Sequence, residues 1–456
     1  MWYPNQHPGG LSAALRALCV SLATLSVVAA CDSVARDPTA PHVTIPVAPQ
    51  RLIVGADVVV LSPFGGTTLN AEAINDAGQV VGTSSLVGTA ATHAFLWTPG
   101  QALQNLGTLG GGFSSAMDIN SSGLVVGRST TASGVFHAFL WTPGQGMQDL
   151  GTMGGGASSA EGINDAGQIV GFSFIAGSSD PHAFLWTPAQ GFQDLGTLGG
   201  TSSYALDINE SGWVVGQSTN SANIGRAFLW RPGQGMQDLG TLGGLTSFAS
   251  GVNNAGQVVG WTTTAGNFDR RAFLWTPGIG MQDLGTLGGT STVAQGINDA
   301  GQVVGHSAPG ALPTTHGFLW TAADGMEDLY PATGITWATA INNRGQVVGG
   351  NRVATLRFQV PNRAPVPNAG GPYTGHKKVA VEFDGTGSSD PDGDALTYAW
   401  DFGDESPLGS GPSPVHEYTA WGTYTVTLTV SDPAGRSAAA TTTVTIAPPG
   451  HLRNPR

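Results

Sequence analysis

The sequence predicts an all-β protein with two folded parts: a seven-bladed β-propeller-like repeat domain and a C-terminal immunoglobulin-like β-sandwich. Three observations support this fold class. One motif returns seven times at a spacing of about 45 residues, glycine accounts for 69 of the 456 residues, and charged residues make up only 10%. Glycine supplies the positive φ angles that tight turns need, and short apolar segments between such turns are typical of strands.

Residues 1–30 are expected to be a lipoprotein signal peptide. The apolar run "LCVSLATLSVVAA", Leu18–Ala30, is too short to span a bilayer comfortably but has the length of a secretory signal. It leads into "VAAC", Val28–Cys31, which resembles the lipobox of bacterial lipoproteins. The resemblance implies lipid attachment at Cys31, which would anchor the chain to a membrane surface without crossing it. A plain signal peptide with an incidental cysteine is the alternative.

Residues 31–50 contain several prolines and no repeat, so we expect a flexible tether there. The only two cysteines of the chain are Cys19 and Cys31. No disulfide framework can therefore support the folded parts, which must be held together by packing.

Residues 51–361 are expected to hold the seven repeats. The asparagine of an "IN" pair recurs at alternating steps of 45 and 44 residues: Asn75, Asn120, Asn164, Asn209, Asn253, Asn298 and Asn342. Each unit offers four strand-length segments, two of them joined by "NDAG" or a close variant, which is typical of a tight hairpin turn. Four short strands in a unit of this length indicate a propeller blade. Six blades with a spare unit, or an open superhelix, remain as alternatives.

The sequence motif of the unit, "HAFLW…DLGTLGG…INDAGQVVG", resembles the bacterial extracellular repeats called the HAF family. The resemblance covers the chain from about Asp57 to Val360. The resemblance implies secretion and repetition. It implies no particular biochemical activity.

Residues 362–450 differ in composition and are expected to form a second domain. "WDFGD", Trp400–Asp404, followed by "HEYTAWGTYTVTLTV", resembles the PKD domain, an extracellular immunoglobulin-like sandwich; Glu405 stands where that family usually has glycine. The second stretch alternates apolar and polar residues with the period of a half-buried strand. The acidic segment "SSDPDGD", Ser388–Asp394, leaves calcium binding open, although acidic turns between strands more often have no ligand.

The composition and motifs also bear on function. A formal net charge of −13 without a basic stripe argues against a nucleic-acid partner. The sequence holds no nucleophile elbow, no paired-histidine metal motif and no phosphate loop, and the units differ in length by one residue, so no inserted loop marks a catalytic site. We therefore expect a monomeric, non-catalytic binding or scaffold protein without cofactor or metal, anchored outside the cytoplasm, with a protein or carbohydrate ligand. A secreted glycan-processing enzyme with a cryptic site and a purely structural envelope protein are the alternatives.

Two residue types recur once per unit and invite a functional interpretation. A histidine precedes "FLW" at His93, His137, His182 and His316, but arginine replaces it at Arg226 and Arg271. Because that replacement is incompatible with metal ligation, we expect a structural polar contact. The aspartate of "QDLG" could form a ring of carboxylates at a channel or pair within its own unit, and the spacing does not decide between these.

Ligand contacts are expected on the loops between "VVG" and "HAFLW", the most divergent part of the repeat. Successive turns of an antiparallel sheet lie at its two ends, so these loops and the "NDAG" turns must lie on opposite rims. Loops on a rigid scaffold often carry recognition, although neutral drift of loops that contact nothing is equally compatible. Units three and five provide the aromatic and charged candidates: Phe172, Phe174, Trp261, Phe268, Asp269 and Arg270.

Overall fold

The computed structural model describes residues 52–266, 269–310, 314–359 and 361–448. The predicted signal peptide, Cys31 and the tether lie outside these residues, as does Phe268. Within them the chain is almost entirely β, and its one helix is the four-residue α1 (Tyr330–Thr333). This confirms the predicted fold class of a β-propeller-like repeat domain and a β-sandwich.

Each unit of the repeat domain contributes a first strand, which lies beside the first strands of the neighbouring units. These strands are β2 (Gly65–Ile74), β6 (Gly110–Ile119), β10 (Gly154–Ile163), β14 (Gly199–Ile208), β18 (Gly243–Val252), β22 (Thr292–Ile297) and β26 (Ala340–Ile341). The second strands, which carry "VVG", are β3 (Val80–Leu86), β7 (Val125–Thr131), β11 (Ile169–Ile175), β15 (Val214–Asn220), β19 (Val258–Thr264), β23 (Val303–Ser307) and β27 (Gln346–Gly349).

Third and fourth strands complete each antiparallel unit. The third strands, which carry "FLW" in the first six units, are β4 (Thr92–Trp97), β8 (Phe136–Thr142), β12 (Pro181–Thr187), β16 (Gly225–Arg231), β20 (Arg270–Thr276), β24 (His316–Thr321) and β28 (Arg352–Gln359). The fourth strands are β5 (Gln104–Asn105), β9 (Gly146–Gly151), β13 (Gly191–Asp194), β17 (Gly235–Asp238), β21 (Gly280–Asp283) and β25 (Gly325–Asp328).

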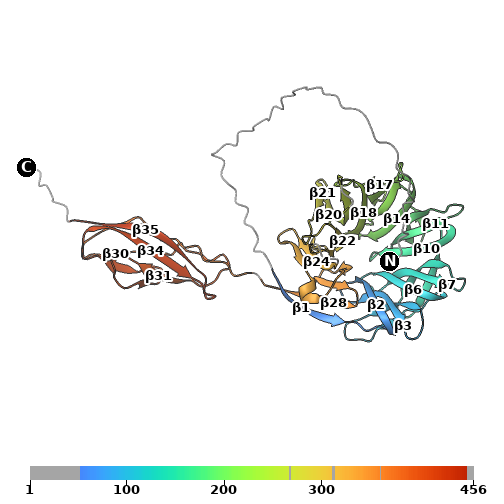
Figure 1. The fold of residues 1–456 in the computed structure, drawn as a ribbon, viewed down its shortest axis with the longest axis horizontal. Coiled ribbons are helices and arrows are strands. Elements are labelled where there is room, and N and C mark those ends of the chain that lie inside the picture. The colour runs from blue at the N-terminus through green and yellow to red at the C-terminus, as the bar shows by residue number, and fades with distance from the viewer. Residues whose placement is uncertain (1–51, 267–268, 311–313, 360, 449–456) are drawn as a thin grey trace, which may run out of the picture. The chain divides into compact units, whose positions relative to one another are not determined.

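The last unit obtains its fourth strand from the other end of the domain. Strand β1 (Leu52–Val60) pairs antiparallel with β28, from Leu52 opposite Gln359 to Val60 opposite Arg352, in the sheet β1-β28-β27-β26. In Figure 1 the sheets follow one another around the domain, and the blue β1 lies beside the orange β28. The strand that directly precedes the first unit in the chain thus completes the sheet of the last unit, which leaves no open end of the array.

A cycle of side-chain hydrogen bonds links the same units. The amide nitrogen of each "IN" asparagine donates to the backbone oxygen of the asparagine in the next unit at 3.0–3.2 Å, and Asn342 donates back to Asn75. All seven asparagines are at least 94% buried. Each buried amide therefore fixes the distance between two first strands, which is incompatible with an open superhelix.

The core lies between neighbouring sheets. The phenylalanine of "FLW" is fully buried in all six units that have it: Phe95, Phe139, Phe184, Phe228, Phe273 and Phe318. The "VVG" glycine permits close packing within the sheet, since a Cβ on Gly216 would collide with the backbone oxygen of Tyr204. The phenylalanine, more than the neighbouring tryptophan, is the constant core residue of the unit.

The C-terminal part is a sandwich of a five-stranded sheet, ordered β29-β35-β34-β31-β32, and a two-stranded sheet, β30-β33. Its strands are β29 (Tyr373–His376), β30 (Ala380–Glu382), β31 (Thr397–Asp401), β32 (Gly409–Ser410), β33 (Val415–Glu417), β34 (Gly422–Ser431) and β35 (Ser437–Ala447). Val426, Leu428 and Val430 of β34 are buried and alternate with more exposed residues, as the sequence predicts. Glu405 has φ +64°, a left-handed conformation that explains why glycine suits this turn.

Candidate functional site

The "NDAG" turns surround a polar hollow of about 280 Å³ at one end of the channel between the first strands. The residue after each asparagine is acidic in four units, at Asp76, Asp165, Glu210 and Asp299. These side chains bond the backbone of the neighbouring turn: Ser121 N donates to Asp165 Oδ1 at 2.8 Å, and Asp165 N donates to Glu210 Oε1 at 3.1 Å. The carboxylates therefore already act as acceptors between units.

Two further carboxylates, Asp118 and Asp207, lie half-buried in the wall of this hollow. Asp118 accepts hydrogen bonds from the backbone of Ile119 and from Ile163 of the next unit, at 2.8 and 2.9 Å. Asp207 accepts the corresponding bonds from Ile208 and Val252. Burial, together with the charge of Asp207, raises the pKa of Asp118 to about 8, and burial raises the pKa of Asp207 to about 6.

A second group of carboxylates belongs to units one and three. Burial raises the pKa of Glu72 to about 7, and the charge of Glu161 contributes to that increase. Burial also raises the pKa of Glu161, against the opposing effects of a 2.5 Å hydrogen bond from Ser159 and of the Arg128 charge. Carboxyl groups with raised pKa values can transfer protons near neutral pH, which is chemistry that acid–base catalysis uses. The sequence analysis missed all four residues.

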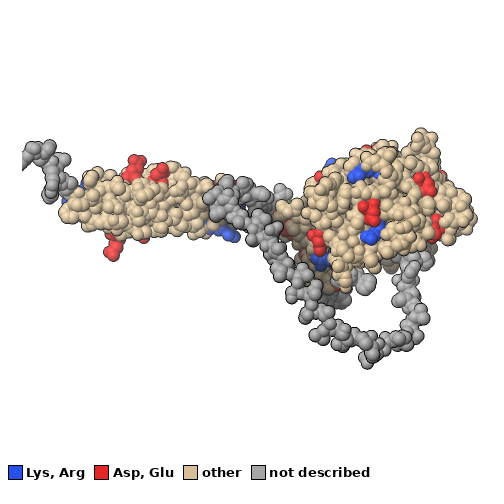
Figure 2. Space-filling view, turned by 90° about the horizontal axis from the view of Figure 1, so that it is seen from above, with Lys and Arg blue, Asp and Glu red and all other residues tan. Residues whose placement is uncertain are grey.

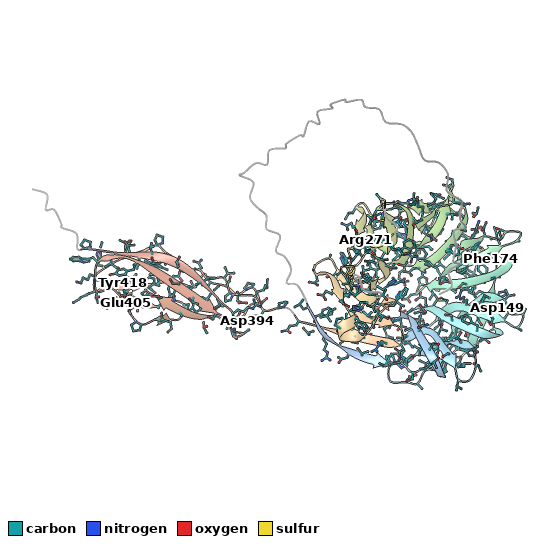
Figure 3. The ribbon with its side chains drawn as sticks, viewed as in Figure 1. Asp149, Phe174, Arg271, Asp394, Glu405 and Tyr418 are labelled. Atoms are coloured by element: carbon teal, nitrogen blue, oxygen red, sulfur yellow. The ribbon has the colours of Figure 1, made fainter. Side chains whose placement is uncertain are left out.

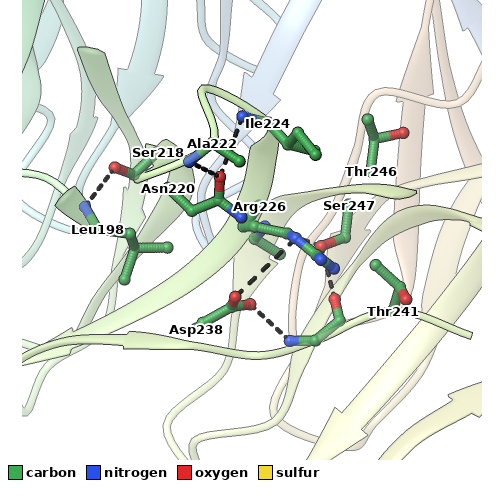
Figure 4. A network of polar contacts seen from close by, with 12 residues as sticks. Leu198, Ser218, Asn220, Ala222, Ile224, Arg226, Asp238, Thr241, Thr246 and Ser247 are labelled. Atoms are coloured by element: carbon green, nitrogen blue, oxygen red, sulfur yellow. Dashed lines mark hydrogen bonds and ion pairs between the residues drawn. The ribbon is translucent and has the colours of Figure 1, made fainter. Parts of the chain in front are cut away.

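The recurring histidines and aspartates pair with each other inside their own units. His137 Nδ1 lies 2.8 Å from Asp149 Oδ2 on the adjacent strand β9, and Arg271 makes the same kind of pair with Asp283. Figure 3 labels Asp149 and Arg271, which belong to different units. In unit four, Arg226 Nε lies 4.0 Å from Asp238, whose Oδ1 accepts the backbone N–H of Gly240 (Figure 4). The expected structural role is confirmed, and the alternative of a carboxylate ring at the channel is wrong for these aspartates.

The residues of unit three predicted to contact a ligand, Phe172 and Phe174, differ in their surroundings, and Phe172 takes part in packing. The ring of Phe172 meets Tyr204 of unit four edge-on, with centroids 5.1 Å apart. Phe174 follows two residues later on β11 and is half-buried (Figure 3). Phe172 and Phe174 thus lie on one face of β11, and Phe172 fills the space between two sheets.

The predicted contacts of unit five form a compact aromatic and cationic group. The Trp261 ring stacks on Phe248 with centroids 5.8 Å apart, and the guanidinium of exposed Arg270 lies 4.4 Å from the Trp261 centroid. Such an arrangement holds an arginine against an aromatic ring by cation–π attraction. Asp269 is half-buried immediately before β20.

Unit six extends this group. His306 lies 3.8 Å, between ring centroids, from Trp337 of unit seven, and Trp337 is 37% exposed. Burial and the charge of Arg270 lower the pKa of His306 to about 4, so its ring is neutral near pH 7. We name Trp261, Phe248, Arg270, His306 and Trp337 the aromatic wall.

The acidic segment of the sandwich is organised by an arginine. Arg363 Nε lies 2.8 Å from Asp392 Oδ1 and its guanidinium also bonds Pro391 O. Asp390 Oδ1 accepts the backbone N–H of Asp392 at 2.7 Å, while its Oδ2 is buried without a hydrogen-bond partner among the described residues. The Arg363 and Asp390 contacts thus hold this turn in a defined conformation.

Within the described residues, no group of three or more His, Cys, Asp or Glu side chains is arranged to hold a metal ion. No helix in that part of the chain has the length and apolar character needed to cross a bilayer. Charged side chains are sparse on the face shown in Figure 2.

Comparison with known proteins identifies the second part of the chain. Residues 362–447 match the family model of the PKD domain and therefore form one. Collagenase ColQ1 of Bacillus cereus is 42% identical over 85 residues, which are 19% of this chain and 9% of that protein. The microbial collagenase of Vibrio alginolyticus is 40% identical over 67 residues, 8% of its length. This chain thus spans less than a tenth of these curated relatives.

Two solved structures are similar to different portions of the chain. The PKD1 domain of Vibrio anguillarum Epp shares 36% identity over 19% of this chain and 99% of that one, with a TM-score of 0.17. The extracellular domain of a hybrid two-component system from B. thetaiotaomicron shares 10% identity over 86% of this chain and 58% of that one, with a TM-score of 0.40.

Proposed function

We propose that this protein is an exported, lipid-anchored binding protein whose repeat domain recognises a protein or glycan without catalysis. The single observation that carries the proposal is the aromatic wall on units five to seven. Trp261 and Arg270 combine a large apolar ring with an exposed donor group 4.4 Å away, the residue types that dominate recognition surfaces. The PKD domain and the HAF-type sequence motif of the repeats favour a localisation of the protein outside the cytoplasm.

A matched pair of variants tests this proposal, because the opposite rim holds a similar contact. The guanidinium of Arg231 also lies 4.4 Å from a tryptophan centroid, that of Trp213. Residues 32–456 would be probed on protein and glycan arrays. We expect the double variant Trp261→Ala/Arg270→Gln to lose the signals of the wild type and Trp213→Ala/Arg231→Gln to keep them. Equal behaviour of both variants would refute binding at the wall, and an array without any signal would favour a purely structural envelope protein.

The lipid anchor is proposed from "VAAC" and has its own test. A clickable fatty acid fed to the producing cells should label the wild-type protein and not Cys31→Ser. Labelling of both forms at the same level would contradict the assignment. Secretion without any label would indicate a plain signal peptide.

Glycan processing is a second candidate because the first strands of units one to four carry carboxylates that the other units lack. Glu72, Asp118, Glu161 and Asp207 are unit-specific, and the pKa values of all four are raised. The protein would be incubated with the polysaccharides that it binds on the array. Hydrolysis would then produce new reducing ends, and a lyase reaction would produce unsaturated products. Turnover that is lost in Asp118→Asn or Glu161→Gln, with binding retained, would replace the non-catalytic proposal.

A further inference from the structure

The sandwich carries both lysines of the chain, and they stand side by side. These residues, Lys377 and Lys378, lie within a protein of net charge −13. Together with His376 and Trp421 they line an open hollow of about 490 Å³. The lysine ammonium of Lys377 lies 5.4 Å from the Trp421 ring centroid, within cation–π range. We name these four residues the lysine–tryptophan patch.

The backbone fixes the two lysines on the sandwich surface. They occupy the centre of the turn between β29 and β30, which is closed by Val379 N donating to His376 O at 3.1 Å. Lys378 N also donates to Tyr418 O at 2.9 Å, so the turn is tied to the domain. The lysine side chains are exposed but start from a defined position.

Lys378 adopts a backbone conformation that disfavours lysine. Its φ is +59°, in the left-handed region where glycine or asparagine occurs at lower cost. Strained residues of this kind concentrate at binding sites, where the side chain has a use that a glycine would not serve. Glycine would relieve this strain, so the variant Lys378→Gly can separate the contribution of the ammonium group from that of the backbone.

Trp421 gives the patch an apolar platform. Its side chain is 57% exposed immediately before β34, although tryptophan is usually among the more buried residues. A flat indole flanked by ammonium groups complements a sugar ring that carries a carboxylate: the apolar face of the ring stacks on the indole, and the carboxylate accepts charge-assisted hydrogen bonds from lysine.

We propose that the lysine–tryptophan patch binds an acidic polysaccharide built from uronic-acid residues. This site is separate from the aromatic wall and does not depend on the function proposed for it. An anionic membrane surface fits less well, because two lysines supply weak attraction to a leaflet and the acidic remainder of the chain opposes it. A nucleic-acid strand fits less well because it requires a longer basic track.

The test uses the full mature chain, residues 32–456, and polygalacturonate as the probe in calorimetry at low salt. The double variant Lys377→Gln/Lys378→Gln should bind about tenfold or more weakly, as expected for loss of charge-assisted hydrogen bonds. Trp421→Ala should weaken binding by a similar factor. The matched control is Arg344→Gln/Arg436→Gln, which removes the same charge elsewhere: Arg344 lies in the repeat domain, and Arg436 lies beyond the far end of β34 from Trp421. It should bind as the wild type does.

Other probes and one further variant make each outcome decisive. Methyl-esterified polygalacturonate should bind at least about tenfold more weakly than the acid form, because its carboxylates are blocked. Lys378→Gly relieves the backbone, so a higher melting temperature with weaker binding supports the proposal and excludes misfolding as the cause. Equal loss in the arginine control, equal binding of the ester, or tighter binding to phosphatidylglycerol vesicles or a thymidine oligonucleotide would each overturn it.

Discussion

The two rims of the repeat domain are built from the same units but differ in what they hold constant. At the "NDAG" rim the asparagine recurs in every unit and its side chain bonds the backbone of the next turn. At the loop rim the segments between second and third strands share neither length nor composition, as "TASGV" and "TAGNFD" illustrate. The asparagine is therefore constant because it carries the backbone hydrogen bonds between units, and the loops vary more because they carry no such recurring bond.

The two rims also differ in the residue types that they carry. We call the "NDAG" rim the constant rim and the loop rim the variable rim. The constant rim collects carboxylates around the channel, whereas Trp261 and Arg270 lie toward the variable rim, on β19 and at the start of β20. One end of the domain thus depends on its acids for structure, and the other displays the residue types that contact ligands.

The largest expected effect breaks the constant rim. Asn209 donates to Asn253 O and accepts the backbone N–H groups of Ser211 and Trp213, each at 3.0 Å. Asn209→Ala should lower the free energy of unfolding by about 3 kcal/mol, because it leaves buried backbone groups without partners. The matched change at the variable rim of the same unit, Ser221→Ala, should stay within about 0.5 kcal/mol. Urea denaturation measures both, and equal effects would show that the rims do not differ in this way.

An intermediate effect concerns the acids of the constant rim. The pKa of Asp118 is about 8 in the folded protein, above its ordinary value of 3.8. The folded state therefore retains a proton that the unfolded state releases, and stability present below about pH 4 is lost as the pH rises through 8. The loss per group is at most about 1.4 kcal/mol per pH unit.

Asp118→Asn should accordingly reduce the fall in melting temperature between acidic and alkaline buffers. The control Asp57→Asn removes one acidic charge from exposed strand β1, 72% exposed at its side chain, and should leave the pH profile unchanged. A wild-type profile that rises toward alkaline pH would contradict the assignment of Asp118.

Much of this fold could be predicted because short sequence motifs determine the turns and strands within each unit. The asparagine–glycine turns and the apolar third strands recur at fixed spacing, so strand number and order within a unit follow from any one copy. Strand β1 could not be predicted as the closing strand, because Leu52–Val60 carries no repeat motif and its partner β28 lies some 300 residues later, as the pair Asp57–Arg357 shows.

The candidate site was predictable only in part. The sequence indicated Trp261 and Arg270 because they stand out in divergent loops, but Phe248 and Trp337 lie elsewhere, five residues before their "IN" asparagines. An alignment of the units at that position, and at the residue after "VVG", would have found them. Asp118 and Asp207 could have been found similarly, since other units have glycine or alanine there.

An exchange of loops at the variable rim should have the smallest effect on stability, and it distinguishes most directly between the two rims as binding sites. The loop of unit two, residues 132–135, would replace residues 176–180 of unit three. Residues 132–136 would replace residues 265–270 of unit five, so that phenylalanine takes the place of Arg270 in the aromatic wall. Because these residues connect strands at the surface, the free energy of unfolding should change by about 0.5 kcal/mol or less, while array binding should be lost. The reciprocal control replaces Asp165 and Ala166 of the constant rim with the two serines of unit two. It removes the acceptor of the Ser121 N–H and should cost about 1 kcal/mol without changing binding. If binding survives the loop exchange and fails in the control, the ligand is held at the acidic mouth of the channel and the assignment of the two rims must be reversed.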